Sequence, residues 1–75
     1  MNVFEKIAIT ILVIVVSSGI KIKSKTGEEI VKKLIYILCE YYNIPYNKYN
    51  ICKILTIIDY INTDVLKILE QIMLK

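Results

Sequence analysis

The side chains that carry most protein chemistry are few in this 75-residue chain. It contains no histidine, and its two cysteines, Cys39 and Cys52, do not form a CxxC pair. Zinc sites need clustered Cys and His ligands, and a reactive thiol needs a neighbour that lowers its pKa. We therefore expect no metal, no cofactor and no catalytic residue. The two cysteines are interpreted as separate thiols, with a Cys39–Cys52 disulfide as the alternative in an oxidising compartment.

The charged residues also argue against an enzyme and against a nucleic-acid-binding protein. The seven acidic residues do not pair along the chain as catalytic acids do. The ten basic residues are all lysines, and the net charge is only +3. Guanine edges and phosphates are matched best by the planar fork of arginine, which is missing. We expect neither a nucleic-acid partner nor a small-molecule substrate.

Five of the six tyrosines lie on both sides of the single proline, Pro45. Tyrosine is enriched at interfaces because one end of its side chain is apolar and the other is polar. We predict that this cluster contacts a partner, and the alternative is that it only packs around the turn at Pro45. The predicted patch consists of Tyr36, Tyr41, Tyr42, Tyr46 and Tyr49.

The first 20 residues are the most apolar part of the chain. Residues 7–20 carry no charge and are hydrophobic at every position of a helical turn, so they need shelter in lipid or in a protein core. A helix over residues 3–20 would be roughly 27 Å long, enough for a thin bilayer. We predict that residues 1–20 form a helix that spans or anchors in a membrane.

Two alternatives remain for this segment. It resembles the core of a signal peptide, with small residues at Ser17 and Ser18 before a cleavage point at Gly19. It would also suit the core of a soluble bundle, either as a helix or, because residues 11–16 are mostly β-branched, as a strand.

A basic linker, residues 21–25, follows the apolar segment. Lys21, Lys23 and Lys25 would contact lipid headgroups at an anionic surface, and by the positive-inside rule they place the C-terminal part in the cytoplasm. The alternative is a solvated linker in a soluble cytoplasmic protein.

Residues 26–75 are predicted to form a module of three short amphipathic helices, which makes the chain all-α. Thr26 and Glu29 have the spacing of a capping box for a helix over residues 27–42. Asn43-Ile44-Pro45 should end that helix, with Asn43 in the left-handed conformation. Its predicted apolar face consists of Ile30, Leu34, Ile37, Leu38 and Tyr41, widened by Val31, Ile35 and Tyr42.

The second helix of this module should begin near residue 46 with Asn47 as a plausible cap, and should run to about residue 61. Asn62-Thr63-Asp64 is expected to break the chain and to cap a third helix. The second face consists of Ile51, Ile54, Leu55, Ile57, Ile58 and Ile61, and the third of Val65, Leu66, Ile68, Leu69, Ile72 and Met73. Fifty residues supply only a thin core, so these faces should need another copy, a partner or a membrane.

The apolar spacing of this arrangement is similar to that of one known family. The pattern is Gly27-x-x-x-Val31-x-x-x-Ile35, then Asn43-Ile44-Pro45, then Ile51-x-x-Ile54-Leu55 and Ile58. It resembles the tail region of the small phage holins of the LLH class. In that family a membrane helix oligomerises to perforate the host bilayer, so the resemblance implies an oligomeric, membrane-perturbing protein.

Three functions are consistent with these features. The first is a single-pass membrane protein whose helical module self-associates or docks a partner. The second is a soluble helical bundle that acts as a protein-binding or structural module, and the third is a small secreted helical protein.

Overall fold

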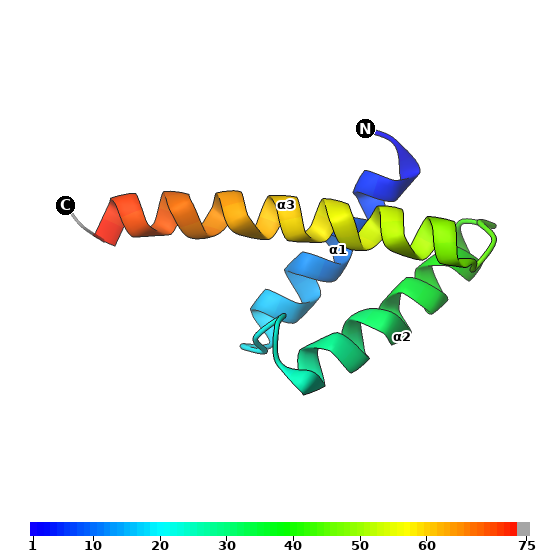
Figure 1. Cartoon of the computed structure of the whole chain (residues 1–75), viewed down its shortest axis with the longest axis horizontal. Helices are drawn as coiled ribbons and strands as arrows, with labels where there is room; N and C mark the ends of the chain where they lie inside the picture. The colour runs from blue at the N-terminus through cyan, green and yellow to red at the C-terminus, as the bar shows by residue number, and fades with distance from the viewer. Residues whose placement is uncertain (74–75) are drawn as a thin grey trace.

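The chain folds into three helices and no strand over the residues described. The structure is a computed structural model that describes the backbone of residues 1–73 and the side chains of residues 1–63, 71 and 72. The helices are α1 (Val3–Ser17), α2 (Lys25–Tyr41) and α3 (Lys48–Met73). The all-α prediction is confirmed. In Figure 1, α3 crosses α1 and continues well beyond it. Helix α2 runs from the C-terminal end of α1 to the N-terminal end of α3.

The apolar N-terminal segment forms the central helix of the fold. Helix α1 packs against both α2 and α3. Its buried residues pack with three residues of α2 and two of α3. This core consists of Ile7, Ala8, Ile11, Leu12, Val15, Val31, Ile35, Cys39, Ile54 and Ile58. The segment is therefore a core helix, as the bundle alternative predicted, and not a strand.

The transmembrane helix predicted over residues 1–20 is not found. None of the helices over residues 1–73 combines the length and the hydrophobicity that crossing a bilayer requires. Helix α1 has 15 residues, which span about 22 Å against the roughly 30 Å of a typical hydrocarbon core. The helix ends at Ser17 because Gly19 turns into the left-handed region at φ 72°. The amides of Gly19 and Ile20 then bond back to the carbonyls of Val16 and Val15.

The start of α2 differs from the predicted capping box of Thr26 and Glu29. Ser24 is the N-cap, and its hydroxyl accepts a hydrogen bond from the Gly27 amide at 3.0 Å. The same hydroxyl donates to the Lys21 carbonyl at 2.6 Å. Ser24 is the cap in place of Thr26 because its hydroxyl both caps the helix and bonds to the Lys21 carbonyl in the preceding connection.

The buried face of α2 is turned away from the predicted face by roughly a quarter of a turn. Its centre is Val31, Ile35 and Cys39, whereas the predicted core residues Ile37 and Tyr41 are 57% and 77% exposed. Gly27 lies on the buried side too and explains the rotation. Because it has no side chain, the backbone of the α1–α2 connection lies directly on it. The i, i+4 row that starts at Gly27 therefore turns inward.

The turn between α2 and α3 was predicted more closely. Asn43 has φ 58°, which confirms its left-handed conformation. The amides of Asn43 and Ile44 bond to the carbonyls of Glu40 and Cys39 at 3.2 and 2.8 Å. Asn47 caps α3, since its side-chain oxygen accepts the Asn50 amide at 2.8 Å. This cap is also confirmed.

The third helix predicted for residues 26–75, which would be the fourth of the chain, is absent as a separate helix. Helix α3 instead runs without a break through residues 62–64. The Thr63 hydroxyl donates to the Asp59 carbonyl at 2.9 Å, one turn back in the same helix, instead of capping a new one. The stretch has no Gly or Pro, so its preference for caps is weaker than the gain from extending a helix already formed. The alternative cap, Asp64, lies outside the described side chains.

Candidate interaction surfaces

The predicted tyrosine patch is divided by the structure into two pairs and one separate residue. Tyr36 and Tyr46 meet edge to face with ring centroids 5.1 Å apart, which links α2 to the turn before α3. Tyr41 and Tyr42 form a second edge-to-face pair at 5.0 Å. Tyr49 is 73% exposed on α3. These tyrosines lie around the α2–α3 turn as the sequence predicted, and their contact with a partner stays a prediction.

Within the first pair, the Tyr36 hydroxyl donates a hydrogen bond to the Glu40 carboxylate at 3.2 Å. That bond and the negative charge of Glu40 raise the pKa of Tyr36 above its usual value. Both side chains are exposed, and their hydrogen bond orients the Tyr36 ring against Tyr46.

Two contacts that hold the helices together were not predicted from the sequence. Asn50 is buried, and its side-chain amide donates to the Pro45 carbonyl at 2.8 Å, which ties the start of α3 to the turn. Its position one turn before Ile54, on the buried face, was the available signal. The Lys53 ammonium lies 4.5 Å from the centre of the Phe4 ring and so connects α3 to α1.

The two cysteines are free thiols in different environments, as the interpretation of separate thiols expected. Cys39 is buried in the core, and burial raises the pKa of its thiol. Folding therefore favours the neutral thiol. The folded state therefore holds the Cys39 proton more tightly than the unfolded chain does. The resulting contribution to the free energy of unfolding is fully present below the ordinary thiol pKa, and it is lost as the pH rises through the raised pKa. Cys52 is exposed on α3.

We expect an aromatic disulfide reagent to modify one thiol rapidly and the other slowly in the native protein. Cys52 should react first, and Cys39 should react at least about a hundredfold more slowly because the core shields it and keeps it protonated. Thiol release followed by absorbance measures both rates, and C52S and C39S assign them. Equal fast rates in the two single variants would contradict the buried position of Cys39.

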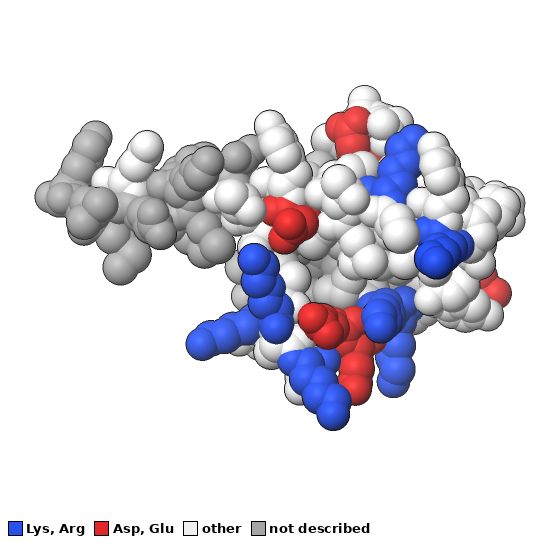
Figure 2. Space-filling model, viewed as in Figure 1, with Lys and Arg blue, Asp and Glu red and all other residues white. Residues whose placement is uncertain are grey.

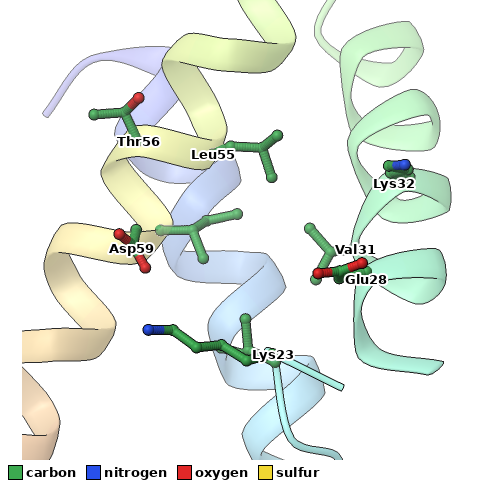
Figure 3. Close-up of a pocket in the computed structure, with 9 residues that line it drawn as sticks. Lys23, Glu28, Val31, Lys32, Leu55, Thr56 and Asp59 are labelled. Carbon is green, nitrogen blue, oxygen red and sulfur yellow. The ribbon is translucent and has the colours of Figure 1, made fainter. Parts of the chain in front are cut away.

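A surface groove of ≈ 710 Å³ lies where the α1–α2 connection, α2 and α3 meet (Figure 3). Charged groups of both signs border it, and Figure 3 shows Lys23 extending toward Asp59. The Thr56 hydroxyl in its lining donates to the Cys52 carbonyl of the same helix at 2.8 Å. Within the described part of the chain, no three acidic or thiol side chains gather to bind a metal ion. The lining residues are Ile22, Lys23, Glu28, Val31, Lys32, Leu55, Thr56, Ile58 and Asp59.

Helix α3 carries an apolar stripe that is longer than the helix it packs on. Apolar β-branched residues recur along it at alternating intervals of three and four, which is the a/d spacing of a coiled coil. Ile54 and Ile58 are buried against the core, but Ile72, on the same stripe, is 64% exposed. The stripe consists of Ile51, Ile54, Ile58, Ile61, Val65, Ile68 and Ile72.

The outer side of α1 is apolar but uncovered. Val13 and Val16 are 59% and 62% exposed, and Ile9, one turn before Val13, is half-buried. The predicted headgroup contacts are all exposed: Lys21 and Lys23 lie in the connection that follows α1, and Lys25 is the first residue of α2. Comparison with protein-family models, curated proteins and solved structures found no match to this chain.

Proposed function

We propose that this chain is a non-enzymatic assembly module that associates with further copies of itself through the second half of α3. The observation that carries the proposal is the apolar stripe of α3. It is buried where α1 covers it and continues at the same spacing where Figure 1 shows α3 extending beyond α1 and α2. Two copies that pair these halves would extend the packing that Ile54 and Ile58 already make.

The accessible surface of the chain is large enough to supply an interface with a second copy. The accessible surface is 5696 Å², whereas a compact monomer of 8.7 kDa would expose about 4,700 Å². The excess of about 1,000 Å² is close to the roughly 800 Å² that each partner buries in an interface of standard size. The radius of gyration of 12.9 Å likewise exceeds the roughly 11 Å of a compact chain of this length.

A second copy is favoured because the stripe is self-complementary. Closed symmetric dimers are the commonest homo-oligomers, and they use the same patch on both chains. Isoleucine at both a and d positions also suits trimers or tetramers, so a small closed oligomer is the expected product. The oligomeric membrane-perturbing role implied by the holin resemblance stays a prediction.

Sedimentation equilibrium tests the proposal. The unmodified chain should sediment as a small oligomer, and I68E with I72E should weaken the association at least about tenfold because two charges enter an apolar interface. The matched control is I37E with Y41E, an i, i+4 pair on the exposed side of α2, which should leave the association unchanged.

Circular dichroism of both double variants would verify that they fold. A monomeric unmodified chain would refute the proposal. Loss of association only in the α2 variant would instead assign the contact to the side of α2 that carries Tyr41.

A further inference from the structure

The net positive charge of the chain is accounted for by one segment. Residues 21–33 contain five lysines and two glutamates, which gives +3, the same as the whole chain. The other five lysines are balanced by the other five acids. Figure 2 shows blue side chains gathered over the α1–α2 connection and the first part of α2. We call residues 21–33 the basic segment. It comes after α1 in the chain, separated from Val16 by four residues.

The first part of the basic segment is held by backbone contacts. Ser24 bonds to the Lys21 carbonyl with both its amide and its hydroxyl, and the connection rests on Gly27. Lys21, Lys23 and Lys25 are all exposed in this segment, and Lys23 also borders the groove that Asp59 lines. Glu28 and Glu29 are the acids within the segment, and the lysines outnumber them.

The uncovered side of α1 offers an apolar surface without charge. Ile9, Val13 and Val16 occupy one side of the helix over roughly 10 Å, and no charged residue occurs between Lys6 and Lys21. Exposed apolar side chains followed along the chain by lysines match the boundary between lipid headgroups and acyl chains. The apolar groups enter that boundary, and the lysines contact anionic headgroups above it.

We propose that this face docks on the surface of an anionic membrane, with Val13 and Val16 inserted and the basic segment against the headgroups. A second copy fits this face poorly, because symmetric pairing would bring two segments of charge +3 together. The proposal concerns surface contact and uses residues outside the α3 stripe, so it does not depend on self-association.

Co-sedimentation with vesicles tests the docking. The chain should bind vesicles of phosphatidylcholine mixed with phosphatidylserine about tenfold more tightly than vesicles of phosphatidylcholine alone. Added salt should reduce this preference, since it screens exposed charges. Binding to neither kind of vesicle, or equal binding to both, would overturn the proposal.

Two pairs of variants test the residues. V13S with V16S should lose about tenfold in binding, while the control I37S with Y41S should not; Ser and Val have similar helix propensities. K21Q with K23Q and K25Q should lose the preference for anionic vesicles. The control K48Q with K67Q and K75Q changes the net charge equally and should retain it. Equal losses in a test variant and its control would overturn the assignment.

Discussion

G27A should destabilise the protein by about 2–3 kcal/mol, although alanine is the better helix former. A Cβ at Gly27 would lie 2.9 Å from the Ile22 carbonyl oxygen and would collide with that of Lys21. Both are backbone atoms, so the connection itself must move and the hydrogen bonds of Ser24 to Lys21 must distort. Thermal unfolding should show a fall in Tm of roughly 10–20 °C.

The control for this prediction is G19A. Gly19 has φ 72° but no atom within 4 Å of a built Cβ, so alanine there meets only conformational strain of about 1 kcal/mol. G27A should therefore be the more damaging of two identical substitutions. A G27A protein as stable as the unmodified chain would show that the connection does not rest on α2.

I35A is expected to lower the free energy of unfolding by about 3–4 kcal/mol, because Ile35 is fully buried and its truncation leaves a cavity against α1. A domain of this length has only about 4–11 kcal/mol of total stability, so the variant should lie close to unfolding. Urea titration at one fixed protein concentration measures the loss and keeps any contribution from self-association constant.

I37A is the matched control, since it removes the same atoms two residues away on the same helix. Ile37 is mostly exposed, so the change should stay within about 0.5 kcal/mol. The pair also decides between two orientations of α2. Equal losses in I35A and I37A would favour the face predicted from the sequence, which contained both Ile35 and Ile37.

Local signals in the sequence predicted helix ends well where one residue determined the backbone. Asn43 and Asn47 are such cases, because a left-handed residue and a cap act within four residues of themselves. Prediction failed where two local choices were nearly equal. Ser24 and Thr26 can both cap a helix, and the contact of Ser24 with the Lys21 carbonyl decides between them.

Longer-range features could not be obtained from spacing alone. The hydrophobicity of residues 7–20 shows that they must be buried away from water. A helix in lipid and a helix in a protein core have the same hydrophobic pattern, so the sequence does not distinguish them. The orientation of α2 depends on the approach of a connection to Gly27. The sequence contains the apolar residues of the α3 stripe at intervals of three and four. These residues form one surface only because α3 is a single helix over Lys48–Met73.

The central position of α1 has a consequence for biosynthesis. Of the three helices α1 is synthesised first, and its α3 partners Ile54 and Ile58 follow Val15 by about 40 residues, later than its partners in α2. At usual translation rates the interval is about 2–8 s, far longer than helix formation or collapse takes. During that interval of each round of synthesis, the side of α1 that α3 covers in the folded chain lacks its partner.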